Sequence, residues 1–144
     1  MSRGRTVLSV IGILLIGFVI LQLLPAPART NPPVISQVQW NSPETEALVR
    51  RTCYDCHSNE TVWPWYAQIA PMSWLVGRDV NEGRRALNFS EVRREFEGGE
   101  LIENIENGKM PPRSYLILHP EANLSDAEKA QLIEGIRATL GAGR

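Results

Sequence analysis

Apolar residues are unevenly distributed along the chain, and the longest uninterrupted run stands near its start. Val7 to Leu24 reads VLSVIGILLIGFVILQLL, which contains no charged residue and a single glutamine. Eighteen helical residues rising 1.5 Å each span about 27 Å, close to the thickness of a bilayer's hydrocarbon core. The run is apolar on all sides, which disfavours the buried helix of a soluble core. The pattern therefore predicts one membrane-spanning helix.

A short basic segment before this run sets its expected orientation. The positive-inside rule keeps Arg3 and Arg5 in the cytoplasm, so the rest of the chain is exported. This predicts a single-pass protein of a bacterial inner membrane whose domain lies in the periplasm. Cleavage as a signal peptide is the alternative, because Ala26-Pro27-Ala28 imitates an A-x-A site. We favour an uncleaved anchor, since the apolar run is long and prolines crowd that site.

The remaining pattern divides the chain into an anchor segment, a linker and one domain. Residues 1–28 form the anchor segment, and residues 29–41 form a proline-rich linker that we expect to be extended and semi-rigid. Residues 42–144 are enough for one domain of normal size. The sequence shows no internal repeat.

Helical periodicity and capping residues recur through this domain, and no segment shows sustained strand alternation. The expected helices cover residues 43–54, 71–87, 91–97, 100–107 and 126–140. Gly98-Gly99 is expected to break the third of them, and residues 113–123 are expected to form a loop. The best-marked helix follows Ser125, because Ser125 and Glu128 have the spacing of a capping box. The domain should be all-α.

The charge balance bears on the class of partner. The chain carries 15 basic and 16 acidic side chains, for a formal net charge of −1. Two of the basic residues, Arg3 and Arg5, belong to the leader, so the exported part is more acidic still. This balance gives no electrostatic basis for binding nucleic acid.

The candidate chemistry is concentrated at the end of the first expected helix of the domain. Cys53-Tyr54-Asp55-Cys56-His57 has the pattern C-x-x-C-H, which is the attachment site of a c-type haem. Each thiol can add across one haem vinyl group to form a thioether, and two intervening residues let both sulfurs reach. The residue that follows lies under the iron, where His57 can serve as an axial ligand.

Other uses of two cysteines fit this sequence less well. A thioredoxin-like dithiol usually sits in a βαβ context, which is missing here. A disulfide across two residues would be strained and would close almost no loop. A zinc site needs about four ligands, and the chain offers two cysteines and two histidines, His57 and His119. We therefore predict covalent haem c at Cys53 and Cys56.

Three side chains could fill the sixth coordination position of the iron. Met110 is our first choice, because it lies in an expected loop and the two prolines after it restrict the local backbone. His119 would give a chemically sound bis-histidine pair. Met72 stands on the apolar stripe of an expected helix, where a core role is favoured. An open site is a further alternative.

Aromatic residues are dense just after the haem motif, in Trp63, Trp65, Tyr66 and Trp74. Such rings can build the wall of a large cofactor site, and an indole N–H or phenol O–H can bond a haem propionate. We expect at least one of these rings to touch the haem.

Longer stretches of the chain resemble a known family. The plan of an N-terminal helix, C-x-x-C-H, intervening helices, a Met-Pro loop and a C-terminal helix looks like a class I cytochrome c. The chain is more closely similar to the bacterial haem-binding domain family, through CYDCHSNETVWPWYAQIAPMSWLV, GRRALNFSE and GKMPPRSYLILHPEANLSDAE. The resemblance implies covalent haem at Cys53 and Cys56, His57 as an axial ligand and Met110 as the distal ligand.

The expected function is therefore a membrane-tethered monohaem protein that carries single electrons to or from an unidentified redox partner. The alternative is a haem-based sensor or a small peroxidase with an open or displaceable sixth ligand. No acid–base pair or nucleophile stands out in the sequence, which favours the electron carrier over an enzyme.

Overall fold

The computed structural model describes residues 3–92 and 98–141, and in these ranges every regular element is helical. The α-helices are α1 (Arg3–Leu23), α2 (Pro43–Thr52), α3 (Tyr54–His57), α4 (Met72–Ala86), α5 (Gly98–Glu106), α6 (Arg113–Leu118) and α7 (Asp126–Leu140). Two short 3₁₀ helices are η1 (Trp65–Gln68) and η2 (Pro120–Ala122). In the described part of the chain, Ser36 and Glu91 form an isolated parallel β-bridge that belongs to no strand. The expectation of an all-α fold is confirmed.

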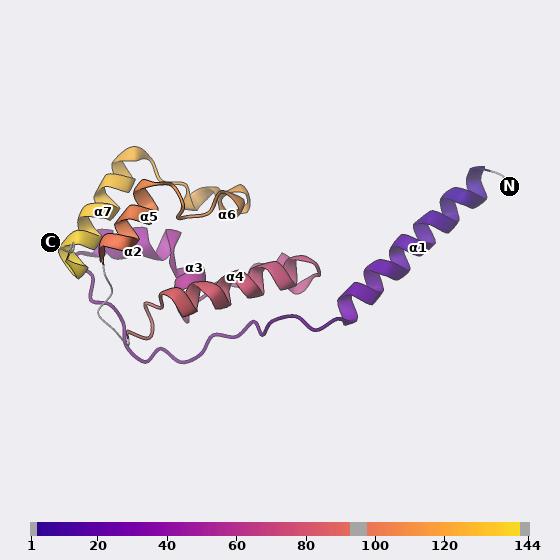
Figure 1. Ribbon diagram of the computed structural model, residues 1–144, viewed down its shortest axis with the longest axis horizontal. Helices are drawn as coiled ribbons and strands as arrows, with labels where there is room; N and C mark the ends of the chain where they lie inside the picture. Colours follow the sequence, from indigo (N-terminus) through magenta and orange to yellow (C-terminus); the bar gives the residue numbers. More distant parts are fainter. Residues whose placement is uncertain (1–2, 93–97, 142–144) are drawn as a thin grey trace.

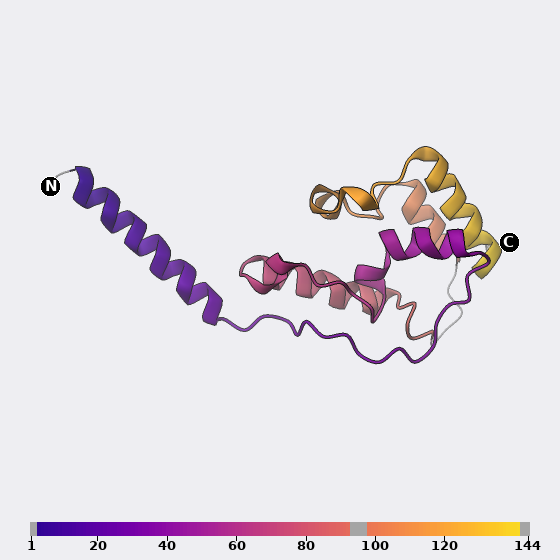
Figure 2. The same ribbon diagram turned by 180° about the vertical axis from the view of Figure 1, so that it is seen from behind.

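Helix α1 stands apart from the other helices as a straight rod (Figures 1 and 2). None of its residues is buried against the domain, and its mean hydropathy of 2.6 and length of 21 residues suffice to cross a membrane. A signal sequence near an N-terminus has the same properties. The predicted apolar helix is present, with the length and composition of a membrane span or a signal sequence.

The main core lies where α2, α5 and α7 pack together. Apolar stripes on these helices meet around the Phe89 ring, which follows α4. The buried core residues are Leu48, Val49, Tyr54, Phe89, Ile102, Ile105, Leu132 and Ile136. Gly135 of α7 lies against the Thr45 side chain of α2, where a β-carbon would collide. The absent side chain lets these two helices approach closely.

Helices α3 and α4 form a second layer beside this core. Helix α6 extends from the core toward the same end as α4 (Figures 1 and 2). Gly83 of α4 lies directly against the backbone carbonyl of Cys56, so the two helices touch with no side chain between them. This contact places α4 against the haem motif.

Two expectations about the elements were wrong, and a third falls mostly on residues outside the described ranges. Gly98 and Gly99 begin α5 instead of breaking a helix, and residues 113–123 form α6 and η2 instead of a loop. The expected helix over 91–97 lies mostly outside the described residues, and at its start Glu91 forms a bridge. The final helix has the expected capping box. The Ser125 hydroxyl accepts from the Glu128 amide, and the Glu128 carboxylate accepts from the Ser125 amide.

The linker is packed against the domain over much of its length. In Figure 1 it runs from α1 beneath α4 to the far end of the domain, where it enters α2. The Arg84 guanidinium donates to the Thr30 carbonyl at 2.8 Å and to the Asn31 side chain at 2.9 Å. Asn59 donates to the Pro33 carbonyl at 3.0 Å. The predicted extended backbone is thus present, with fixed contacts to α4.

Candidate functional site

The haem motif lies at the junction of α2 and α3. Cys53 is the last residue of α2's hydrogen-bond pattern, since its amide donates to the Val49 carbonyl at 2.8 Å. Its own carbonyl then accepts from the amides of Cys56 at 3.2 Å and His57 at 2.9 Å. This single tight turn places Cys53, Cys56 and His57 together in the lining of one cavity.

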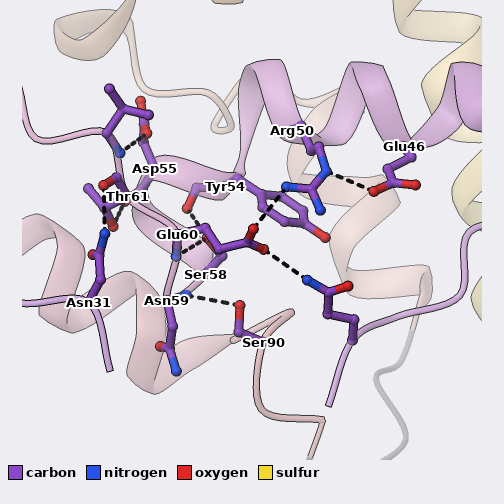
Figure 3. Close-up of polar contacts among 12 residues, drawn as sticks. Asn31, Glu46, Arg50, Tyr54, Asp55, Ser58, Asn59, Glu60, Thr61 and Ser90 are labelled. Carbon is purple, nitrogen blue, oxygen red and sulfur yellow. Dashed lines mark hydrogen bonds and ion pairs between the residues drawn. The ribbon is translucent and has the colours of Figure 1, made fainter. Parts of the chain in front are cut away.

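A network of polar contacts holds the chain after the motif (Figure 3). The Asp55 carboxylate accepts from the Val62 amide at 2.9 Å, and its carbonyl accepts from the Thr61 hydroxyl at 2.7 Å. The Ser58 hydroxyl donates to the Tyr54 carbonyl at 2.7 Å, and Arg50 pairs with Glu60 at 3.3 Å. These contacts tie the residues that follow the motif to the motif itself.

The His57 ring has a defined tautomer. Its Nδ1 lies 3.1 Å from the Leu87 carbonyl oxygen, which can only accept, so Nδ1 carries the proton. The lone pair of the neutral ring is then on Nε2. Burial lowers the pKa of His57, although hydrogen bonds to the backbone of Leu87 and Gly83 oppose this effect. A neutral imidazole with its second nitrogen anchored is the form that ligates a metal.

The two thiols have raised pKa values, whereas a reactive dithiol has a lowered one. Burial raises the pKa of Cys53 to about 11, partly offset by the Thr52 hydroxyl. Burial, followed by the charges of Asp55 and Asp79, raises the pKa of Cys56 to about 11. Catalytic dithiols depend on a lowered pKa, so these cysteines do not fit a thioredoxin-like role.

The cavity that these groups line has a volume of about 630 Å³, within the range of small-molecule and cofactor sites. Its wall is mostly apolar. The apolar lining residues other than methionine are Val62, Leu75, Val76, Val80, Ala86, Leu87, Phe89, Leu101, Ile105, Leu118 and Leu132. Of the rings singled out after the motif, Tyr66 lines the cavity. Whether a ring touches haem stays a prediction.

All three candidates for the sixth ligand also line this cavity. Met110 follows α5, and the amides of Lys109 and Met110 both donate to the Asn104 carbonyl, at 2.9 and 3.0 Å. This double contact fixes the backbone that carries the Met110 thioether. Met72 opens α4, as the sequence indicated.

His119 is engaged at both ring nitrogens. Nδ1 lies 3.2 Å from a carboxylate oxygen of Glu121, and Nε2 lies 2.7 Å from the Tyr66 hydroxyl. The ring also stacks on Tyr115 at a centroid distance of 4.1 Å and an angle of 9°. An iron bond would require one of these hydrogen bonds to break, which favours Met110 over His119.

Two hydrogen bonds across the cavity were missed by sequence reasoning. Tyr115 of α6 donates to the Asp55 carboxylate at 2.8 Å, inside the C-x-x-C segment. Tyr66 and His119 form the second bond. The partners are separated by 60 and 53 residues, so no local pattern could reveal them. The first bond ties α6 to the haem motif, and the second ties η1 to the residue after α6.

These residues fit a covalently held haem. Both cysteines, the histidine and a methionine line one cavity, whose other lining is mostly apolar but includes the charged residues Asp55, Arg78, Asp79 and Glu82. In the described part of the chain, no group of three or more His, Cys, Asp or Glu side chains could hold a bare metal ion. The arrangement therefore suits a prosthetic group better than a zinc site.

Comparisons with known proteins also point to haem binding. Cytochrome c peroxidase Ccp of Escherichia coli (strain K12) is 26% identical over 110 residues, which cover 70% of this chain and 24% of that protein. The chain thus matches about a quarter of the length of this relative. No solved structure matches significantly. The sequence model described as "Haem-binding domain" matches residues 16–138. With most of its length matched, the chain belongs to the haem-binding domain family.

Proposed function

We propose that this protein is a membrane-tethered c-type haem protein that carries single electrons. The observation that carries the proposal is the shared cavity, which brings together the thiols of Cys53 and Cys56, the imidazole of His57 and the thioether of Met110. Bound haem would supply reversible one-electron oxidation and reduction at its iron.

Each residue has a distinct role in this proposal. Cys53 and Cys56 would hold the haem through thioethers, and His57 and Met110 would be the axial ligands. The bond from His57 Nδ1 to the Leu87 carbonyl would keep the ring's orientation unchanged between oxidation states. The Met110 backbone is held at Asn104. Ligands that move little lower the reorganisation that accompanies electron transfer.

We also propose that α1 remains in the membrane and that the domain lies in the periplasm. The apolar helix and the arginines before it support this arrangement. Both cysteines would then be in the compartment where bacterial c-type haem is attached.

The test of covalent attachment is a mass measurement on protein made with the cytochrome maturation machinery. We expect the mass after acid–acetone extraction to exceed that of the polypeptide by one haem. The matched control is Cys53→Ser with Cys56→Ser, which should lose this mass. An unmodified mass for the parent protein would refute the proposal. The same spectrum reports whether residues 1–28 are retained.

A second candidate is a small peroxidase or haem-based sensor. The similarity to a cytochrome c peroxidase supports it, as does the hydrogen-bonded pair of Tyr66 and His119 at the cavity wall. This function needs an open or displaceable sixth position. Rapid carbon monoxide binding by the unmutated reduced protein would favour it, whereas slow or absent binding would favour the electron carrier.

A further inference from the structure

One end of the domain is unusually apolar. Residues 62–77 contain no charged side chain and no histidine, in a chain whose charged content is 22%. Large apolar side chains from this stretch and from the end of α6 are exposed. We call the following four the apolar rim, with exposed fractions in parentheses: Trp65 (76%), Ile69 (39%), Ile117 (78%) and Leu118 (52%).

The two parts of the apolar rim come together although they are far apart in sequence. Trp65 and Ile69 belong to η1 and its C-terminal boundary, whereas Ile117 and Leu118 end α6. The bond between Tyr66 and His119 joins these two segments at 2.7 Å. Both segments therefore lie at the same end of the domain.

The end of α1 is attached to this same region. Gln22 pairs with the backbone of Ala70: its Oε1 accepts from the Ala70 amide at 2.9 Å, and its Nε2 lies 3.4 Å from the Ala70 carbonyl. A β-carbon on Gly77 would lie 3.0 Å from the Pro27 side chain, so α4 also touches the chain just after α1. The family match begins at residue 16, inside α1.

The arrangement of elements agrees with these contacts. Figures 1 and 2 show the start of α4 and the tip of α6 on the side of the domain that faces α1, while α7 and the C-terminus lie at the opposite end. Any membrane that surrounds α1 would therefore meet the domain at its apolar end.

We propose that the apolar rim docks on the bilayer, with its side chains in the interfacial layer of the leaflet that α1 leaves. The inference rests on the membrane anchoring of α1 proposed above. Tryptophan is enriched at this depth. The free energy falls when exposed aliphatic side chains leave water. The occupant is lipid because the Gln22–Ala70 contact holds this surface beside the membrane exit of α1.

Docking would also direct the cavity toward the membrane. Val62, Leu75 and Leu118 are exposed and line the cavity at the same time, so the cavity opens between them. With the apolar rim in lipid, this opening faces the bilayer surface. Small apolar reactants dissolved in lipid would reach it more readily than a soluble protein would.

The test places a spin label at single introduced cysteines in the full-length, haem-loaded protein in phosphatidylcholine nanodiscs. Haem occupies Cys53 and Cys56, so only the introduced thiol reacts. The three positions are Ile117→Cys on the rim, Glu134→Cys on the far end and Ile13→Cys in α1. Electron spin echo modulation from deuterium then reports contact with deuterated acyl chains or, in a second sample, with heavy water.

We expect lipid modulation at positions 13 and 117 and water modulation at position 134. Adding Trp65→Glu should reduce the lipid modulation at position 117 at least about twofold, because it replaces an aromatic ring that favours the interface with a charged group that favours water. Lipid contact at 13, together with water contact and no lipid contact at 117, would overturn the docking alone. Loss of both contacts at 117 would indicate a second protein copy and would also overturn it. Absence of lipid at 13 would instead refute the anchor.

Discussion

At the scale of single residues, the proposed axial pair differs in how firmly each member is held. His57 is half-buried and anchored through Nδ1, whereas Met110 is 37% exposed and held through its backbone at Asn104. Met110 is therefore the ligand that a mutation can remove with least damage to the fold.

Met110→Ala should convert the reduced protein into one that binds carbon monoxide readily. Removing the thioether opens a coordination position on the iron, so we expect binding to be about tenfold faster or more. Stopped-flow absorption at the haem band measures this rate. Met72→Ala is the matched control, since Met72 lines the same cavity. Equal rates for Met110→Ala and the parent protein would exclude Met110 as a ligand.

Gly83→Ala should destabilise the haem-loaded protein, against the usual trend for helices. Alanine normally stabilises a helix interior over glycine by about 1 kcal/mol. Here its β-carbon would collide with the Cys56 carbonyl, and overpacking costs about 1–3 kcal/mol. Gly99→Ala in α5 is the control, because open space surrounds that position. Chemical denaturation compares the two, and equal stabilities would contradict the close packing.

At the scale of elements, α2 and α7 are joined by an ion pair as well as by apolar packing. Arg51 of α2 pairs with Glu128, which also completes the capping box of α7. The hydrogen bond from Arg51 and those from Ser125 lower the pKa of Glu128 to about 2, from an ordinary value of 4.5. A carboxyl group with a lowered pKa in the folded state contributes stability above pH 4.5.

That contribution should disappear as the pH falls from about 4.5 toward 2, where Glu128 becomes protonated. Glu128→Gln should lower the free energy of unfolding at pH 7 and flatten its dependence on pH over this interval. Glutamine can still complete a capping box, so the variant tests the charge. Glu134→Gln, exposed on the same helix, is the control. An unchanged pH profile in Glu128→Gln would show that the ion pair contributes nothing.

The elements also show which sequence patterns carry structural information. The α7 helix could be predicted because its capping box and apolar stripe are local. Helix α6 has six residues, fewer than two turns, so no helical period can show in it. Gly98 lies in α5, where its missing side chain accommodates the Gly141 carbonyl. That contact spans 43 residues, and local propensity cannot reveal it.

At the scale of the whole molecule, hydrogen bonds from α4 hold the linker against the domain. Arg84 donates to Thr30 and Asn31 in the linker and to Ser58 and Thr61 beside the haem motif. One guanidinium thus connects the linker to the residues that follow the haem motif.

Arg84→Leu should release the linker and speed tryptic cleavage after Arg29, because proteolysis needs local unfolding. We expect the rate to increase by about fivefold or more, measured by mass spectrometry of timed digests. Arg85→Leu, one residue along α4, should leave the rate unchanged. The haem spectrum of each variant checks that the site is intact. Equal rates for both variants would mean that the linker is not held at Arg84.

Over the whole molecule, local sequence patterns point to the haem motif but not to its surroundings. C-x-x-C-H is a contiguous pattern set by thioether chemistry, so the sequence alone suffices to propose Cys53, Cys56 and His57 as haem-binding residues, which stays a prediction. The contacts that close the cavity, Tyr115 with Asp55 and Tyr66 with His119, depend on how α6 folds back. Such pairings follow from tertiary structure alone.

The central claim is that Cys53, Cys56, His57 and Met110 hold one covalent haem, and an absorption spectrum tests it most directly. The protein is produced with periplasmic haem maturation and measured in both oxidation states. We predict a haem that resists acid–acetone extraction and a weak near-infrared charge-transfer band from methionine ligation in the oxidised form. A covalent haem without that band would contradict Met110 ligation, and a fully extractable haem would contradict covalent attachment.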